Sequence, residues 1–155
     1  MRHIGTKLFI VAALTGLAAF GADNSLGTWK LNMEKSKFHP APGPVKSLTS
    51  TREASDGGVK ATSTGERADG TPVNASYTAK YDGKEFPVTG APWDTMTLKQ
   101  VNANTLTGTT TKSSGKYRGT SRTVISKNGK TMTTTSKGTG EDGKPFHNVM
   151  VYDKQ

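Results

Sequence analysis

Residues 71–84 read TPVNASYTAKYDGK and carry the two signals that decide the fold of this chain. Apolar or aromatic side chains occupy every second position from Val73 to Tyr81, and polar side chains occupy the positions between them. A period of two is typical of a β-strand with one face buried and the other in water. The pair Asp82-Gly83 then ends the run, and such a pair accepts the positive φ angles of a tight hairpin. The stretch therefore predicts a strand that reverses into an antiparallel neighbour.

The same kind of turn signal recurs along the whole chain. Short turn pairs lie at Asp56-Gly57, Asp69-Gly70, Asp82-Gly83, Ser114-Gly115, Asn128-Gly129 and Asp142-Gly143. They separate runs rich in Val and Thr, and the 24 Thr residues of the chain suit pleated, half-buried strands. The predicted strands cover residues 26–32, 45–54, 59–67, 73–81, 86–89, 95–101, 105–112, 117–126, 131–138 and 146–153. No segment carries a convincing helical period. We therefore expect an all-β, antiparallel up-and-down meander of about 8–10 strands, and this number favours a closed barrel over a sandwich.

The N-terminus has the layout of a secretory signal peptide. Arg2 and Lys7 precede an uncharged apolar run from Leu8 to Phe20, and small residues follow. A transmembrane anchor is the rival interpretation, but the run is shorter than the roughly 20 residues that span a bilayer. The predicted domains are a signal peptide over 1–21, with a cut after Ala22 as an alternative, and a single β-barrel over 22–155. The predicted location is secreted or periplasmic.

The chain is basic, with a formal net charge of +9. Loss of Arg2 and Lys7 with the leader would leave 19 basic residues against 12 acidic ones, a net charge of +7. A positive surface favours anionic partners such as an envelope polymer. The lysines are nevertheless scattered, with no run of five or six, which is typical of solubility and edge protection. No nucleic-acid partner is expected.

Residue types that carry out catalysis or hold metals are scarce. The chain has no Cys, and after the leader only His39 and His147 remain, without the spacing of a metal motif. Asp56, Asp69, Asp82 and Asp142 each directly precede Gly in a predicted turn, where their side chains stabilise the turn itself. The sequence therefore predicts no enzyme activity, no cofactor and no metal site.

Two arginines offer an anion site. Arg118 and Arg122 are four residues apart on one predicted strand and therefore share a face. If this face is interior, the two guanidinium groups could bind a carboxylate or phosphate. If Tyr117 and Ile125 point inward instead, both arginines lie in solvent, and the adjacent Val124 leaves the register open.

The first and last strands carry a family resemblance. Leu26-Gly27-Thr28-Trp29-Lys30-Leu31 contains a Gly-x-Trp pattern, and the chain closes on Val151-Tyr152-Asp153-Lys154. Both stretches resemble the lipocalin and fatty-acid-binding protein superfamily (calycin barrels), and the chain is also similar to small uncharacterised secreted proteins of soil bacteria. The resemblance implies a lipocalin-like barrel in which Trp29 is a structural plug. It also implies a basic partner for that ring, with Lys154, Arg118 and Arg122 as the candidates.

Two functions from different classes follow. In the first, the barrel binds a small amphipathic or anionic molecule, with Tyr77, Tyr81, Met96 and Leu98 lining the cavity and Arg118 or Arg122 meeting an anionic head. In the second, side chains fill the barrel and its basic exterior contacts envelope polymers or a protein partner. Trp93, between Pro92 and Asp94 in a loop, would either make such surface contacts or cap the core.

Overall fold

The computed structural model describes residues 21–155, which form eleven β-strands. The strands are β1 (Gly27–Leu31), β2 (Lys37–His39), β3 (Val45–Ser55), β4 (Gly58–Arg67), β5 (Pro72–Lys80), β6 (Phe86–Thr89), β7 (Thr95–Asn102), β8 (Thr105–Thr111), β9 (Arg118–Ile125), β10 (Thr131–Thr139) and β11 (Pro145–Lys154). The predicted signal peptide lies outside the described residues, apart from Gly21. None of the described residues belongs to a helix long and apolar enough to cross a membrane.

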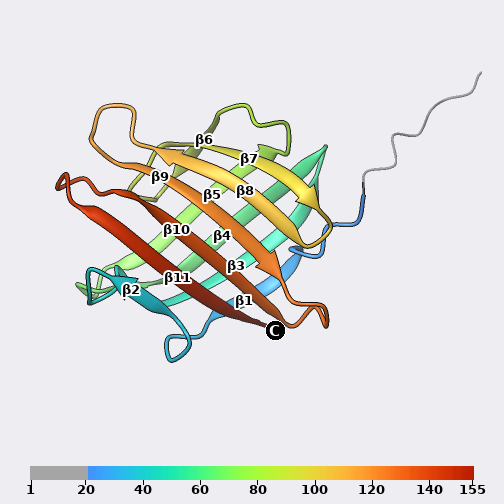
Figure 1. The fold of residues 1–155 in the computed structure, drawn as a ribbon, viewed down its shortest axis with the longest axis horizontal. Helices are drawn as coiled ribbons and strands as arrows, with labels where there is room; N and C mark the ends of the chain where they lie inside the picture. Colours follow the sequence, from blue (N-terminus) through green and yellow to red (C-terminus); the bar gives the residue numbers. More distant parts are fainter. Residues whose placement is uncertain (1–20) are drawn as a thin grey trace, which may run out of the picture.

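The strands form one closed antiparallel barrel (Figure 1). From β3 to β11 each strand pairs with the next in the chain, and β1 closes the ring by pairing with both β3 and β11. The sequence prediction of an all-β up-and-down barrel is confirmed, and each of the ten predicted strands has its counterpart. Closure leaves the ring without a free edge, which removes the hazard of edge-to-edge association.

β2 is the strand that the sequence analysis did not predict. It pairs with β11 over Lys37–His39, on the same edge of β11 that β1 occupies closer to the C-terminus. Between the two strands the chain turns at Asn32–Ser36, and the Ser36 Oγ atom accepts a 2.9 Å hydrogen bond from the Val151 backbone N–H. A side chain thus replaces the missing ladder partner, and β1 and β2 together act as one interrupted strand.

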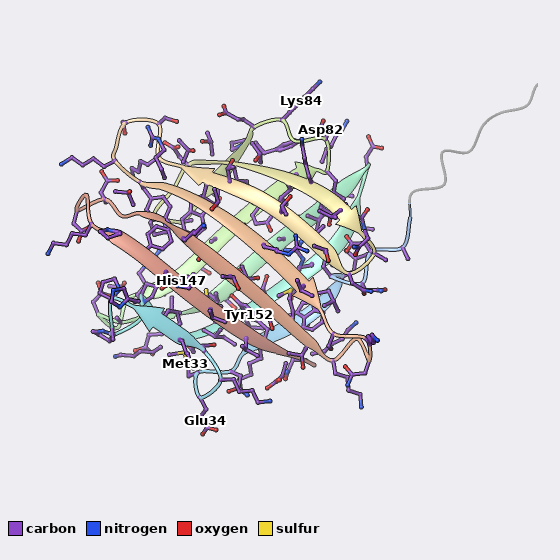
Figure 2. All side chains as sticks on the ribbon, in the orientation of Figure 1. Met33, Glu34, Asp82, Lys84, His147 and Tyr152 are labelled. Atoms are coloured by element: carbon purple, nitrogen blue, oxygen red, sulfur yellow. The ribbon has the colours of Figure 1, made fainter. Side chains whose placement is uncertain are left out.

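The turn pairs do what the sequence predicts. All six lie between consecutive strands, and in five of them the Gly has a positive φ angle, for example +68° at Gly57 and +71° at Asn128-Gly129. Gly115 is the exception, because it lies in a longer loop that does not require this conformation. Figure 2 shows charged side chains such as Glu34 and Lys84 projecting from connecting segments into solvent.

The barrel has two different ends. We call the first the base: it is formed by the β3–β4, β5–β6, β7–β8 and β9–β10 connections together with segment 22–26. We call the second the mouth: it is formed by loops 40–44, 68–71, 90–94, 112–117 and 140–144, and it faces left in Figure 1. Buried side chains form two clusters: Trp29, Leu31, Ile125, Met132 and Tyr152 lie toward the base, whereas Val59, Ala79, Val88, Met96 and Leu98 lie along β4 to β7 and are packed against Trp93 of the mouth.

Small inward-facing residues on β8, β9 and β10 leave the barrel hollow on that side, between the base and the mouth. On β8, β9 and β10 the inward residues Gly108, Ser121 and Ser136 lie side by side in register. The next inward row toward the mouth is Thr110, Gly119 and Gly138. The side chains of Gly, Ser and Thr are too short to reach across a ten-stranded ring. These rows therefore leave a space inside the barrel.

Candidate ligand-binding cavity

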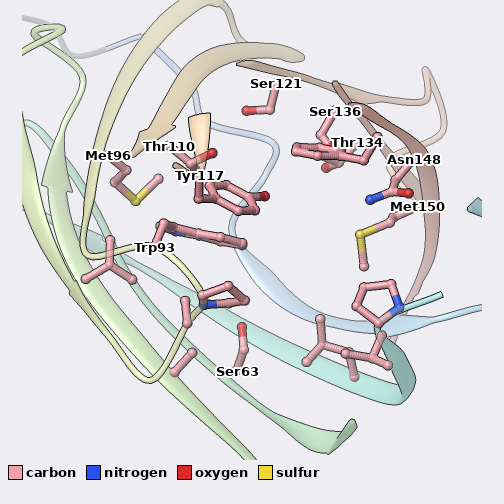
Figure 3. Close-up of a pocket in the computed structure, with 18 of the residues that line it drawn as sticks. Ser63, Trp93, Met96, Thr110, Tyr117, Ser121, Thr134, Ser136, Asn148 and Met150 are labelled. Atoms are coloured by element: carbon pink, nitrogen blue, oxygen red, sulfur yellow. The ribbon is translucent and has the colours of Figure 1, made fainter. Parts of the chain in front are cut away.

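The interior holds a cavity of about 560 Å³ (Figure 3). This volume is within the range of small-molecule sites, roughly 300–1,000 Å³. Side chains of the barrel strands line it, and so do residues of the mouth loops, including Pro42, Trp93 and Asp142. The cavity therefore extends from near the base of the barrel to the mouth.

The two sides of the cavity differ in polarity. Strands β3 to β7 contribute mainly apolar groups, namely Val45, Leu48, Val73, Ala75, Val88, Met96 and Leu98. Strands β8 to β11 contribute more hydroxyl and amide groups, which we call the polar wall, namely Thr110, Ser121, Thr123, Thr134, Ser136 and Asn148, and they also contribute apolar side chains such as Leu106, Met132, Phe146 and Met150. Figure 3 shows Ser121, Ser136, Thr134 and Asn148 grouped on one side of the space. Such a lining suits a molecule that has both apolar surface and hydrogen-bonding groups.

Arg52 is the charged residue deep in this cavity. It is only 9% exposed, and its position near the C-terminal end of β3 places it toward the base. Its Nε donates a 3.3 Å hydrogen bond to the Ser25 hydroxyl, and its Nη1 donates a 2.9 Å bond to the Tyr77 hydroxyl. The third nitrogen, Nη2, is buried without a hydrogen-bond partner.

Arg52 remains charged in this setting. Burial acts to lower its pKa, but Coulombic interactions with Tyr77, Tyr81 and Asp23 and the hydrogen bond to Tyr77 act in the opposite direction, and together they raise the pKa above its usual value. None of the ion pairs among the described residues includes Arg52. A buried guanidinium with an unpaired N–H is costly. An anion in the cavity would remove this cost.

Tyr152, on β11, completes the polar group at this depth. Burial raises its pKa, and both Tyr77 and Arg52 lie near enough to affect its ionisation electrostatically. Its hydroxyl donates a long hydrogen bond, 3.9 Å, to the Met150 sulfur. We call Arg52, Tyr77 and Tyr152 the base cluster. All three line the cavity, and each brings at least one N–H or O–H donor.

Segment 22–26 holds the base cluster from outside. The Asp23 carboxylate accepts hydrogen bonds from the Ser25 N–H and hydroxyl, at 2.9 and 2.6 Å, and from the Tyr81 hydroxyl. Burial and, second, the bond to Asp23 raise the pKa of Tyr81 to about 12. Asn24 ties the segment to the β7–β8 turn through the Ala103 carbonyl. The segment therefore crosses the base and orients Arg52 through Ser25.

An aromatic row lies at the mouth. The rings of Trp93 and Tyr117 are 5.4 Å apart with a 30° interplanar angle, and those of Tyr117 and Phe146 are 5.4 Å apart at 24°. Gly119 makes room for this row, because a Cβ at that position would lie 3.2 Å from the Phe146 ring. Figure 3 shows Trp93 and Tyr117 next to each other in the cavity. The Trp93 Nε1 atom is buried and has no hydrogen-bond partner.

Asp94 fixes the loop that carries Trp93. Its carboxylate accepts hydrogen bonds from the Ser113 N–H at 2.9 Å and the Ser113 hydroxyl at 3.0 Å, and the backbone bond is the largest cause of its lowered pKa. The Asp94 backbone also bonds to Val88 and Thr111 on either side. Trp93 therefore occupies its place in a loop tied to the β8–β9 connection.

The structure places the predicted site residues in different surroundings. Tyr77, Met96 and Leu98 line the cavity. Tyr81 does not line it, because its side chain reaches Asp23 at the base. Arg118 and Arg122 are exposed on the outer face of β9.

The position of the two arginines follows from the register of β9. Tyr117 and Ile125 point inward, which was one of the two alternatives, so the residues of opposite parity face solvent. The prediction that Arg118 or Arg122 faces the cavity was therefore wrong. The Arg118 Nη1 instead donates to backbone carbonyls of its own loop, including that of Lys112 at 2.8 Å.

Trp29 lies in the base, fully buried. Its Nε1 donates a 2.8 Å hydrogen bond to the Ser25 carbonyl, and the Lys154 Nζ lies 5.2 Å from the ring centroid. Of the three candidate basic partners, Lys154 is the one over this ring. Gly27 permits the approach, since its φ of +119° and the Lys154 Cε at 3.0 Å from an added Cβ both disfavour any other residue.

Sequence reasoning missed Arg52 and left Trp93 open between surface contacts and capping of the core. A signal for Arg52 was present, because Leu48, Ser50 and Arg52 are spaced by two residues and a buried Leu48 would place Arg52 on the same face. No comparable signal exists for Trp93, because loop residues have no period. Among residues 21–155, no group of three or more His, Asp or Glu side chains is arranged to hold a metal ion.

The barrel and its cavity define a lipocalin-like and fatty-acid-binding-protein-like fold, a calycin barrel. A solved structure of the zebrafish ileal bile acid-binding protein, in complex with cholic acid, is similar to the chain with a TM-score of 0.51 and 15% sequence identity. The similarity covers 86% of this chain and 100% of the zebrafish protein. No protein-family profile and no curated protein sequence matches the chain.

Proposed function

We propose that this protein binds a small amphipathic molecule with an anionic group inside its barrel, and that it does so as a non-enzymatic, secreted or periplasmic protein. The observation that carries the proposal is the unpaired Nη2 of Arg52, a buried charged donor at the bottom of an open cavity. Charge-assisted hydrogen bonds to a carboxylate or phosphate are the strong ones in proteins. The neighbouring hydroxyls of Tyr77 and Tyr152 add neutral donors for the same head group.

The remainder of the cavity supports the amphipathic part of the proposal. The apolar wall of β3 to β7 would cover a hydrocarbon body, while the anion lies toward the base. The fold supports it as well, since the similar zebrafish protein was solved with cholic acid bound. The proposed location rests on the predicted signal peptide alone.

The surface-interaction alternative is less well supported. It required a barrel filled by side chains, whereas the interior contains about 560 Å³ of space. Its second element, a basic exterior that contacts anionic envelope polymers, is compatible with the net charge of the chain. Such contacts would weaken steeply with salt, whereas a ligand buried at Arg52 would be screened much less.

The direct test is native mass spectrometry of the protein purified from its own host, before and after mild denaturation. We expect a reproducible small mass that is lost on unfolding, and an acidic group in the released compound. A chain that is bare under gentle conditions, and that binds none of the probes described next, would contradict the proposal.

Arg52 can be tested with a matched pair of probes, tetradecanoate and tetradecanol. The wild-type protein should prefer the carboxylate, and Arg52→Gln should reduce that preference by roughly 10- to 100-fold, the range expected for a hydrogen bond to a charged group. Isothermal titration calorimetry gives both affinities. Binding of the alcohol should change little.

Arg122→Gln is the control, because it removes the same charge from the outer face of the barrel. It should leave both affinities unchanged. Circular dichroism and the unfolding midpoint show whether Arg52→Gln still folds. If Arg52→Gln does not fold, Arg52→Lys takes its place, because it keeps the positive charge. Equal affinity of the wild-type protein for acid and alcohol would overturn the assignment of Arg52.

A further inference from the structure

The described residues contain two buried side-chain polar atoms without a partner, and both belong to residues that line the same cavity. Arg52 Nη2 is the first and already has a role in the proposed function. Trp93 Nε1 is the second. A buried N–H without an acceptor is rare in folded proteins because it loses its bond to water without replacement. Two such N–H donors on residues that line one cavity indicate that the bound molecule supplies both acceptors.

The two donors lie in different parts of the cavity. Arg52 is seven residues along β3 from Val45 and is held by Ser25 at the base. Trp93 is held in mouth loop 90–94 and packs against Tyr117, which precedes β9 at the same end. One anionic group cannot serve both atoms if it is bound at the base. A second polar group on the ligand is required for the indole.

Trp93 differs from Trp29 in that, within residues 21–155, the protein supplies no acceptor for its indole N–H. The Trp29 Nε1 has the Ser25 carbonyl as its acceptor, so the fold itself satisfies it. The Trp93 ring contacts Tyr117, and the bonds of Asp94 to Ser113 hold its loop, yet no described residue supplies an acceptor for its buried N–H. A residue that lines the cavity thus carries a donor that the fold does not satisfy.

We infer that the ligand has two polar ends: an anionic group at Arg52 and, toward the mouth, an oxygen acceptor such as a carbonyl or hydroxyl that bonds to Trp93 Nε1. This inference rests on the proposed function and narrows its ligand class to bifunctional molecules. The polar wall that includes Thr110 and Ser121 lies in the same part of the cavity and offers further hydroxyl partners to that oxygen. A simple fatty acid would satisfy only the first site.

The test uses the full-length protein, tetradecanoate and a series of oxotetradecanoates that carry one carbonyl at different distances from the carboxylate. At least one position should bind about three- to tenfold more tightly than tetradecanoate, the gain expected from one neutral hydrogen bond to a buried donor. Trp93→Phe keeps an aromatic ring beside Tyr117 and removes the N–H. It should abolish the preference for the oxo acid, measured as the ratio of the two affinities within the same variant.

Nuclear magnetic resonance supplies a second readout, because the chain has only two indole N–H groups. Binding of the preferred oxo acid should move the Trp93 indole proton downfield, as expected on gaining an acceptor, and should leave the Trp29 signal in place. Trp93→Phe assigns the two signals by removing one.

The outcomes separate the two proposals. If tetradecanoate binds through Arg52 but no carbonyl position improves affinity, or if the improvement survives in Trp93→Phe, then water is the partner of Trp93 and the inference is wrong while the proposed function stands. If neither tetradecanoate nor any oxo acid binds, both proposals are overturned.

Discussion

Ser25 connects the features of the base through its carbonyl and its hydroxyl. Its carbonyl accepts from Trp29, its hydroxyl accepts from Arg52, and the same hydroxyl donates to Asp23. The residue is 1% exposed, so these bonds form out of contact with water. A single small residue thus links the buried tryptophan to the cavity arginine, and the stability of the base and the orientation of the anion donor depend on each other.

Trp29 should be the most sensitive residue for stability. Trp29→Ala removes the largest fully buried side chain, so we expect the free energy of unfolding to fall by about 3–5 kcal/mol, the usual cost of truncating a buried aromatic residue. Denaturant unfolding measures it. Lys154→Met, which removes the cation over the same ring, should cost no more than about 1 kcal/mol. If Trp29→Ala lowered the free energy of unfolding by less than about 1 kcal/mol, the ring would not support the barrel.

At the scale of the strand, β9 separates the inside of the barrel from the outside. Ser121 lines the cavity, between Gly108 on β8 and Ser136 on β10, while the adjacent Thr120 is exposed. Neighbouring residues on this strand therefore make opposite contacts. The same alternation keeps Arg118 and Arg122 in solvent.

This alternation allows a matched pair of substitutions on β9. Ser121→Phe should place a ring in the cavity and weaken binding of tetradecanoate at least tenfold, while the protein stays folded because the space can accept the ring. Thr120→Phe puts the same ring on the outer face and should leave binding unchanged. Calorimetry and the unfolding midpoint together measure both effects. Equal weakening by the two substitutions would show that the interior is not the binding site.

At the scale of the whole molecule, burial of tyrosines makes the barrel sensitive to alkali. Burial is the main cause of the raised pKa of Tyr81, Tyr117 and Tyr152, and the pKa of Tyr81 reaches about 12. A raised folded-state pKa stabilises the fold fully below the unfolded value of about 10. This stabilisation is lost as the pH rises through the folded values, because the unfolded chain gives up these protons more easily.

We therefore expect the unfolding midpoint to fall between about pH 10 and pH 12. Phenolate absorbance, followed in the same titration, should rise at a higher pH in the folded protein than in the protein dissolved in denaturant. Tyr81→Phe should remove part of the delay. Coincident titration curves in the two states would contradict the burial of these hydroxyls.

The sequence by itself determined the strands, their reversals and the barrel class. Each of these depends on local information: a period of two between neighbouring side chains, and a Gly after Asp or Asn where a turn needs positive φ. The inward set Tyr77, Met96 and Leu98 followed from the same period. β2 escaped prediction because three residues after a turn carry no measurable period, and its partner β11 is more than 100 residues away in the chain.

Only the tertiary structure decided which residues meet inside the barrel. The register of β9 depends on its pairing with β8 and β10, so the inward parity that excludes Arg118 and Arg122 was not readable from the strand alone. Arg52 became the cavity cation because ring closure brings β3 beside β1 and segment 22–26 across the base. Trp93 entered the cavity because loop contacts with Ser113 and Tyr117 place it there. Local preferences determine elements, whereas a binding site is a set of distances between elements, and those are set by packing.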